Sequence, residues 1–491
     1  MEKIVFASGV FAPLACAAFI AVASPLISRK CAKFVAALGF ILSLVSAIFS
    51  AWAFLDGANL AFDTVYFGSF TLNGVSLAMY LLAAIVGAAA GFYAIFLEGI
   101  EKIKTYLSLL LFMQTGLMGM FATDNIFWMY AFHEFALVPT FIATCVWGGE
   151  NKRQAAMEMA IYLTLGALVA LFGIVALSFA ASGIVISSLS ELKVALASAS
   201  ISVDSQYWIF GLLVLGLGTL VSLFPFHSWA PKAYTAAPTS FAMLHAGVLK
   251  KFGLYFLIQV AVPFLGVGAR DWSGIIMVLA LVNVIGIGLC TMAQTDLKKM
   301  ISYSSVSHMG LCFLGIMSLS VVGAAGSVLL MFGHGLSVAA LFALDAIISK
   351  RFGTDSMRTL AGAYKKMPVC AGLFIAAILA NIGLPGFANF WGELSIFVSL
   401  GGVNFAVCVL AVSGIVISAI YGLRAVASIF YGPESEVVAR ADARDIGVVE
   451  RIPAVLLLAA LIVVGFCPQL LTSALDATLS NVASFNNLLL K

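Results

Sequence analysis

The sequence predicts an all-α polytopic membrane protein with about 14 transmembrane helices. Its 491 residues are 63% hydrophobic and 10% charged, and the mean hydropathy is +1.12. Soluble domains are about 45–50% apolar and about 25% charged. Too little polar surface remains to cover a compact body in water, which excludes soluble globular, disordered and collagen-like proteins. Two further observations support this fold class: a series of long apolar runs, and an uneven distribution of basic residues between the loops.

The apolar runs define the elements in order. Runs of about 18 residues or more predict membrane-spanning helices, because about 20 helical residues cross the hydrocarbon core. They lie at 4–27, 32–54, 74–97, 105–122, 125–147, 159–183, 207–229, 238–262, 273–293, 300–320, 323–348, 368–400, 403–431 and 453–475. Met1–Lys3 is too short and too weakly basic for a secretory signal, so we expect the first span to be retained.

The basic residues predict the orientation. Of the 25 Lys and Arg residues, 18 fall in loops on one side of the predicted bundle and four, Lys491 among them, on the other. The remaining three, Lys250, Lys251 and Arg424, lie within spans. Because basic residues accumulate in cytoplasmic loops, the side with 18 is predicted to be the cytoplasm. Both termini are then expected on the outer side.

The cysteine pattern gives no sign of a cofactor. The eight cysteines stand singly in apolar stretches without a CxxC pair, at positions 16, 31, 145, 290, 312, 370, 408 and 467. We interpret them as small core residues, so no haem, iron–sulfur or zinc site is predicted in this chain.

An internal repeat organises the chain. We expect helices one to three at 1–104, a first repeat of helices four to eight at 105–262, a second repeat of helices nine to thirteen at 273–431, and a C-terminal helix fourteen within 453–491. Each repeat has five spans, so the second enters the membrane from the opposite face.

The fourth span of each repeat carries a proline break. These breaks are Phe224-Pro225-Phe226 and Leu384-Pro385-Gly386. Proline removes a helix hydrogen bond and kinks the span. Paired broken helices in inverted repeats are typical of proteins that move ions across membranes. The alternative is that both prolines only kink their helices, but their matching positions favour the functional interpretation.

Ionisable residues within spans are the candidate chemistry. A charge at the bilayer centre costs about 2.5–3.5 kcal/mol on insertion scales, so such groups tend to be paired, neutral or functional. Glu134 lies in span five, Lys250 and Lys251 in span eight, and Glu393 beyond the second break. We interpret Asp345, one turn from the cytoplasmic end of its span, as a cap or interface residue.

All five histidines also fall within spans. His308 follows Ser302 and Ser305 at three-residue spacing, and His334 lies mid-span, so the two predict a proton relay through neutral imidazoles. His133 and His245 are equally explained as polar packing residues, because helical geometry turns them away from the neighbouring charges.

These residues resemble a known family: the antiporter-like, proton-pumping subunits of bacterial respiratory complex I, NADH:quinone oxidoreductase. The motifs that carry the resemblance are Phe224-Pro225-Phe226-His227-Ser228-Trp229 with Ala237-Pro238-Thr239, Asp296-Leu297-Lys298-Lys299 running into Tyr303 to Gly310, His334-Gly335-Leu336-Ser337, and Leu384-Pro385-Gly386 with Gly392-Glu393. Of three paralogues in the family, subunit M carries a glutamate in span twelve and the others a lysine. Glu393 therefore indicates subunit M.

The resemblance implies roles for individual residues. Glu134 and Glu393 would be the acidic pair, Lys251 the bridging lysine, and His308 and His334 the central histidines. Protons would enter from the cytoplasm, shift along a mid-membrane polar axis and leave outside, driven by quinone chemistry elsewhere in the complex. The resemblance also implies a bacterial inner-membrane location, L-like and N-like antiporter subunits and the lipid bilayer as partners, no nucleic acid, and no NADH, flavin or quinone site in this chain.

Three departures from the family pattern stand out. The family places a lysine seven residues before His227, where this chain has Leu220. Lys250 is an extra lysine, and Asn73 replaces an aspartate before span three. We expect Lys250 to substitute for the lost lysine as the cation beside Glu134.

Three other hypotheses remain open. The chain is alternatively a same-fold subunit of a membrane-bound hydrogenase or of a multisubunit cation/proton antiporter. Glu393 favours complex I over both. The last alternative is a spacer subunit that no longer pumps protons. Leu220, in place of the family's lysine, favours this alternative.

Overall fold

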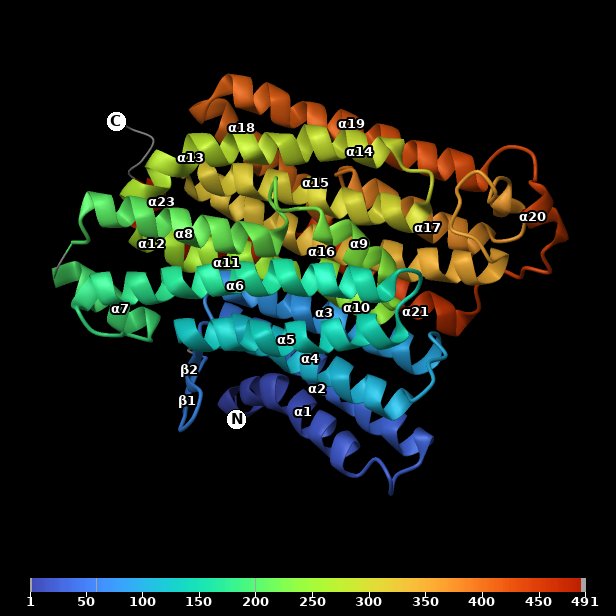
Figure 1. The fold of residues 1–491 in the computed structure, drawn as a ribbon, viewed down its shortest axis with the longest axis horizontal. Coiled ribbons are helices and arrows are strands. Elements are labelled where there is room, and N and C mark those ends of the chain that lie inside the picture. The colour runs from blue at the N-terminus through green and yellow to red at the C-terminus, as the bar shows by residue number, and fades with distance from the viewer. Residues whose placement is uncertain (1, 59, 199, 487–491) are drawn as a thin grey trace.

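The computed structural model describes residues 2–58, 60–198 and 200–486 as a bundle of helices that run side by side (Figure 1). Within these residues, 13 helices are long and apolar enough to cross a membrane. The broken pair α17 (Pro368–Asn381) and α18 (Ala388–Val403) accounts for the remaining predicted span. The predicted all-α polytopic fold is confirmed.

The N-terminal helices and first repeat follow the predicted order. They are α1 (Glu2–Val22), α2 (Arg29–Leu55), α3 (Gly74–Phe96), α4 (Ile103–Ala122), α5 (Ile126–Trp147), α6 (Lys152–Ser182), the broken pair α8 (Val203–Val221) and α9 (Trp229–Ala236), and a helix beginning with α10 (Thr239–Gly247).

The second repeat and C-terminus follow. They comprise α13 (Gly266–Leu281), η3 (Val282–Ile287) and α14 (Gly288–Ala293), which form one span, then α15 (Leu297–Met317), α16 (Val321–Phe352), α17, α18, α19 (Phe405–Phe430), α20 (Glu436–Arg440), α21 (Val448–Phe466), α22 (Gln469–Leu479) and α23 (Ala483–Asn486).

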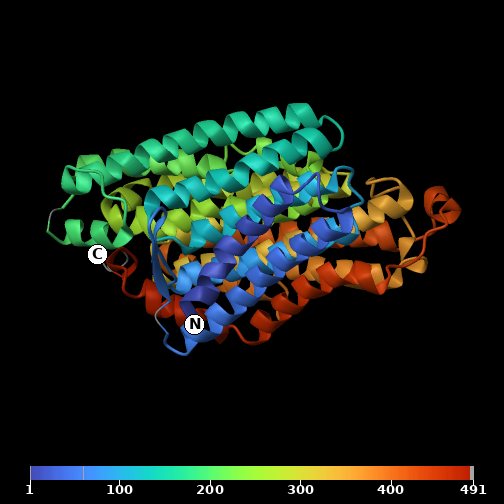
Figure 2. The same cartoon turned by 90° about the horizontal axis from the view of Figure 1, so that it is seen from below.

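Three features differ from the sequence-based expectation. A hairpin of β1 (Ala61–Thr64) and β2 (Gly68–Thr71) and the helix α7 (Leu189–Ser198) lie at the same end of the bundle as both termini (Figures 1 and 2). The expected last span, 453–475, is wrong at both edges, because α21 ends at Phe466 and Pro468 separates it from α22. Proline and the residue before it disfavour a continuous helix. Lys491 lies outside the described residues.

The break between α8 and α9 is held by a neighbouring helix. Ser222 has a left-handed backbone, φ 71°, and ends α8. The Asn283 side chain accepts from the Phe224 N–H at 2.7 Å and donates to the Ser222 carbonyl at 3.0 Å. Backbone groups freed by a break at membrane depth must find such partners, since hydrocarbon offers none.

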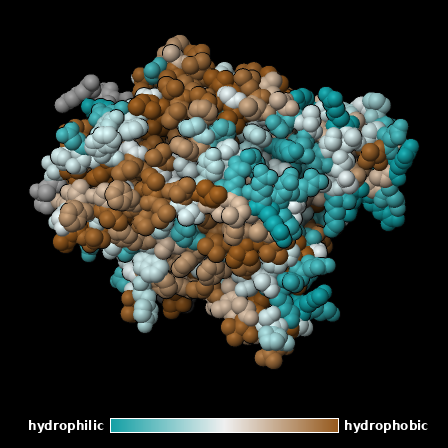
Figure 3. Space-filling view, viewed as in Figure 1, coloured by the Kyte–Doolittle hydropathy of each residue, from teal (hydrophilic) through white to brown (hydrophobic). Residues whose placement is uncertain are grey.

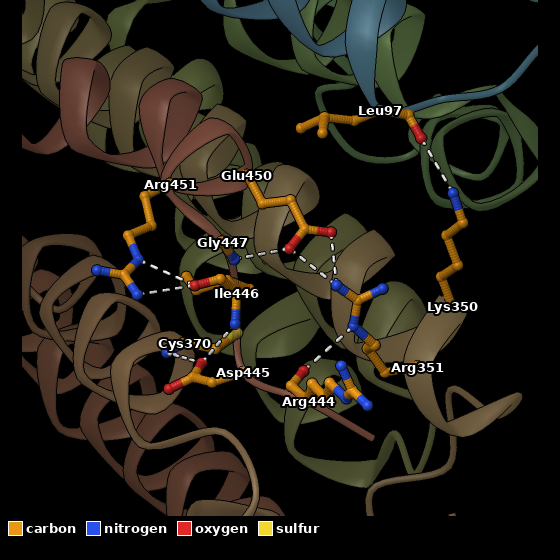
Figure 4. A network of polar contacts seen from close by, with 10 residues as sticks. All are labelled: Leu97, Lys350, Arg351, Cys370, Arg444, Asp445, Ile446, Gly447, Glu450 and Arg451. Carbon is orange, nitrogen blue, oxygen red and sulfur yellow. Dashed lines mark hydrogen bonds and ion pairs between the residues drawn. The ribbon is translucent and has the colours of Figure 1, made fainter. Parts of the chain in front are cut away.

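The two ends of the bundle differ in polarity. Hydrophilic residues gather at the end that carries α20, opposite the termini (Figure 3). There Arg351 of α16 binds Glu450 of α21 at 2.6 Å, and Lys350 donates to the Leu97 carbonyl (Figure 4). Asp445 accepts from the Val369 and Cys370 N–H groups at the start of α17. These contacts fix the ends of α16, α17 and α21 relative to each other.

Candidate functional site

The eighth span is irregular where its lysines lie. After α10 the chain forms a 3-10 turn, η1 (Leu249–Lys251), then α11 (Phe252–Phe256), a π-helical segment, η2 (Leu257–Ala261), and α12 (Val262–Phe264). Lys250 is 1% exposed and Lys251 0%. Such departures from α-helix persist at membrane depth only where protein surrounds them, and they are frequent at functional sites.

Lys251 contacts the central histidine of α16. Its Nζ donates to the Ala246 carbonyl at 2.6 Å and lies 3.0 Å from Nδ1 of His334. When Lys251 is an ammonium it can only donate, and Nδ1 is then the acceptor while the His334 ring carries its proton on Nε2. That Nε2 is buried without a hydrogen-bond partner in the described part of the chain. Lys251 and His334 are therefore paired in a geometry that suits proton transfer.

The next titratable side chain beyond His334 is His308 of α15. Its ring centroid lies 5.3 Å from that of His334. Its Nδ1 is 2.8 Å from the Ser304 carbonyl, and its Nε2 is 2.9 Å from the Asn381 carbonyl at the end of α17. Carbonyl oxygens only accept, so both contacts are satisfied only when both ring nitrogens carry protons. The two carbonyl partners therefore fix the orientation of the His308 ring.

Glu393 completes this row. It is 4% exposed in α18, just beyond the second break. A small cavity, about the size of one water molecule, joins it to His308. The cavity is lined by Val284, Ser307, His308, Leu311, Glu393, Gly414, Ile415 and Ser418. The carboxylate also lies against Gly383, where an added Cβ would be 2.0 Å from Oε2. We call Lys251, His334, His308 and Glu393 the central row.

Lys250 turns away from the central row. Its Nζ donates to the carbonyl of Ser305 at 2.9 Å and lies 3.0 Å from the Ser305 hydroxyl. It also lies 5.3 Å from the ring centre of Tyr234, a distance typical of a cation–π contact. The two adjacent lysines therefore reach different helices, Lys250 toward α15 and Lys251 toward α16.

The expected pairing of Lys250 with Glu134 is wrong. The Glu134 side chain is 30% exposed, and its Oε1 lies 3.3 Å from Nδ1 of His133. Leu220, at the position where the family has a lysine, is buried at 2% exposure. Sequence reasoning treated His133 as a packing residue because adjacent helical positions diverge, yet two side chains can still lean together. His133 also stacks on Phe252 with ring centroids 4.5 Å apart.

The other two histidines have different surroundings. His245 lies between the rings of Trp229 and Tyr234, at 5.5 and 5.1 Å. It is within electrostatic reach of Lys250 and His133. His227 sits in the first break and stacks on Phe224. Its Nδ1 is buried without a partner among the described residues. Neither ring makes a described hydrogen bond to the central row.

Sequence reasoning missed several polar partners. Asn381 binds His308 through its carbonyl and Ser337 through its side chain at 3.3 Å. Its place at the end of α17, three residues before Leu384 of the Leu384-Pro385-Gly386 break, was a usable signal, because a broken helix exposes backbone carbonyls at its end. Asn73 caps α3 and exchanges two amide hydrogen bonds, of 2.8 and 3.2 Å, with Gln259 of η2.

Asp345 also differs from expectation. It is not a surface cap, because it is 1% exposed. Its Oδ1 has no hydrogen-bond partner in the described part of the chain.

Comparison with known proteins places the chain in a family. Residues 122–418 match the family described as NADH:quinone oxidoreductase/Mrp antiporter, transmembrane. The chain belongs to this family. It is 31% identical to NAD(P)H-quinone oxidoreductase chain 4 1 of a Synechococcus strain, over 85% of this chain and 79% of the relative. It is 30% identical to NADH-quinone oxidoreductase subunit M of Rickettsia felis, over 81% and 82%.

Solved structures share the fold. Among them is a chain of respiratory complex I from Thermus thermophilus, 24% identical, with a TM-score of 0.87 over 99% of this chain and all of the other. A chain of the Mrp complex from Dietzia sp. matches with 18% identity and a TM-score of 0.85, over 100% and 99%. The bundle with two broken helices is thus the fold of this family of membrane subunits.

Proposed function

We propose that the chain is a membrane-arm subunit of NADH:quinone oxidoreductase that translocates protons across the inner membrane. The observation that carries the proposal is the central row of four titratable side chains buried in mid-bundle. Lys251 and His334 are 3.0 Å apart, the rings of His334 and His308 are neighbours, and His308 and Glu393 line one small cavity. The names of the family relatives support the complex, and Glu393 favours the M-type subunit among its paralogues. Quinone reduction elsewhere in the complex would supply the driving energy.

The chain's own residues move protons and no electrons in this proposal. Lys251 gives a proton from Nζ to Nδ1 of His334, across 3.0 Å. His334, now with protons on both nitrogens, releases one toward His308, whose two carbonyl partners favour the doubly protonated ring. His308 then passes a proton through the small cavity to the Glu393 carboxylate. Lys251 is then a neutral amine and His334 keeps the proton it received on Nδ1, so Lys251 must be reprotonated and the His334 ring must return to the Nε2 tautomer before the next transfer.

The remaining features of the proposal concern its setting. Polar loops with most basic residues face the cytoplasm, and both termini face the outside. L-like and N-like antiporter subunits are the expected neighbours in the bilayer. The chain is a non-redox part of the enzyme and holds no NADH, flavin or quinone site of its own.

The test has two parts. The tagged chain is purified from membranes in mild detergent and its partners are identified. Flavoprotein and iron–sulfur subunits of an NADH:quinone oxidoreductase are expected, whereas hydrogenase or antiporter subunits would contradict the assignment.

Proton movement is then measured in inverted vesicles as dye quenching per NADH oxidised. Lys251→Ala is expected to lower this ratio in a fully assembled complex. An unchanged ratio would favour the spacer hypothesis, which the buried Leu220 supports.

A further inference from the structure

Asp345 occupies a specific place on α16. It lies three turns from His334, which is about 16 Å along the helix and within about 20° of the same face. It lies on the side of His334 that leads toward Lys350 and Arg351, at the polar end of the bundle. The helix α16 packs against α10, α3 and α15, among other helices. Asp345 is therefore a buried carboxyl between the predicted cytoplasmic surface and the central row.

Charged groups from two neighbouring segments interact electrostatically with Asp345. Asp355 follows α16, Asp296 and Lys298 begin α15, and all three are within electrostatic reach of the carboxyl. These three residues are partly exposed, and we call them the rim. From α3, Tyr93 is also within electrostatic reach of Asp345.

Backbone pairing holds this rim in place. The Leu297 N–H donates to the Asp355 carbonyl at 2.8 Å, and Asp296 forms a β-bridge with Ser356. The Lys298 Nζ donates to the Ala237 carbonyl at 3.0 Å. The rim thus ties the segment after α16 to the start of α15, beside the first turn of α10.

Two carboxylate oxygens in this region lack partners. Oδ1 of Asp345 and Oδ1 of Asp355 are buried with no hydrogen bond from any described residue. An unsatisfied buried polar atom costs about 1–3 kcal/mol, so its retention needs a reason. The carboxyls with structural roles at the same end are different. Glu450 binds Arg351 and the Gly447 N–H with its two oxygens (Figure 4). Asp445 accepts the backbone N–H groups of Cys370 and Ile446, which Figure 4 draws, and that of Val369.

We propose that Asp345 is the proton-loading carboxyl of this chain on its cytoplasmic side. Its free Oδ1 takes a proton from water that reaches the rim of Asp296, Lys298 and Asp355, which converts the carboxylate to the neutral acid. The neutral acid is then the proton donor that supplies the central row. The negative rim residues attract protons, and Lys298 offsets part of their mutual repulsion. The inference rests on the proposed function, because it assigns to Asp345 the supply of protons to the same central row.

The experiment compares four variants in the assembled complex. Asp345→Asn removes the titratable group, Asp345→Glu keeps it, Glu450→Gln is a control that disturbs a satisfied carboxyl, and Lys251→Ala interrupts the central row. Proton movement per NADH oxidised is measured in inverted vesicles. Asp345→Asn is expected to lower this ratio as much as Lys251→Ala does. Asp345→Glu is expected to keep most of the ratio. Glu450→Gln is expected to leave the ratio unchanged, even where less of the complex assembles.

Two further measurements separate a proton-loading role from a structural one. Asp345→Leu is expected to keep or raise the Tm of the complex while lowering the pumping ratio, because it removes an unpartnered buried carboxyl. The double variant of Asp345→Asn and Lys251→Ala is expected to lose no more than either single variant.

The outcomes are distinguishable. A normal ratio in Asp345→Asn with a lowered ratio in Lys251→Ala would overturn the role of Asp345 and leave the proposed function standing. A normal ratio in both would overturn the proposed function itself. A lower Tm in Asp345→Leu together with a normal ratio would assign Asp345 a packing role.

Discussion

The Nζ atom of Lys251 lies 3.0 Å from Nδ1 of His334, although the two residues are 83 positions apart and both are fully buried. The contact joins the last helix of the first repeat to the third helix of the second. In the proposed function, it is the point where a proton passes between the two halves of the fold. The predictions below follow from this contact and from the groups on either side of it.

Glu393 is expected to receive protons at the far end of the central row. Glu393→Ala should assemble but lower proton movement per NADH oxidised, because no carboxyl then follows His308. Glu393→Asp should retain pumping, since the acid is kept beside the small cavity. The ratio is measured by dye quenching in inverted vesicles. Full pumping in an assembled Glu393→Ala complex would remove this role.

Gly383 offers an indirect test of the same carboxylate. An added Cβ would be 2.0 Å from Oε2 of Glu393, so Gly383→Ala must displace the side chain. We expect it to lower the pumping ratio in the same way as Glu393→Ala. Gly353 is the matched control, because it also has a positive φ but open space around it. Equal effects of Gly353→Ala and Gly383→Ala would show that backbone strain, not displacement of Glu393, is responsible.

Glu134 is expected to be coupled to His133 and independent of Lys250. The carboxylate lies 3.3 Å from the His133 ring, whereas Lys250 binds Ser305. Double-mutant cycles on the pumping ratio should therefore give non-additive losses for Glu134→Gln with His133→Ala. The cycle of Glu134→Gln with Lys250→Met should be additive. Coupling in the second cycle would restore the idea that Lys250 replaces the lysine lost at Leu220.

Glu98, in the loop between α3 and α4, should make stability depend on pH. Burial raises the pKa of Glu98 above its ordinary value of 4.5, and this effect outweighs the hydrogen bonds from Ser240 and Tyr106 that lower it. The folded state therefore binds a proton that the unfolded chain has already lost above pH 4.5. The free energy of unfolding therefore decreases as the pH rises from 4.5 through the raised pKa of Glu98.

Glu98→Gln removes this titration. The Tm of the variant relative to the unaltered complex should therefore rise between about pH 4.5 and neutrality. Glu436→Gln, at an exposed ion pair on α20, is the control and should show no such trend. A Tm difference that stays constant with pH for Glu98→Gln would contradict the expectation.

Much of the fold could be predicted because membrane spans have a strong signal. Apolar length alone located the helices, and the two proline motifs located both breaks. The end of α21 was missed because its apolar pattern continues past Phe466, while Pro468 stops the helix. The hairpin of β1 and β2 was missed because short strands outside the spans carry little hydrophobic periodicity.

The site was predictable in composition and less so in pairing. Glu134, Lys251 and Glu393 could be identified as site residues because placing a charge at mid-membrane depth costs free energy, so such residues tend to be functional. The partner of Lys250 could not be found this way, because the 3-10 turn at 249–251 sets where its side chain points. Asp345 was misjudged for a related reason. Its distance from the helix end suggested a cap or interface position, but the packed bundle buries it at 1% exposure.

The comparison of Lys251→Ala with Lys250→Ala tests the central claim most directly. Both lysines are buried neighbours in one turn, so each substitution removes the same charge at the same depth. Proton movement per NADH oxidised is measured for both in assembled complex. A large loss for Lys251→Ala with a small loss for Lys250→Ala is predicted, because only Lys251 contacts His334. Equal losses, or a larger loss at Lys250, would contradict the central row.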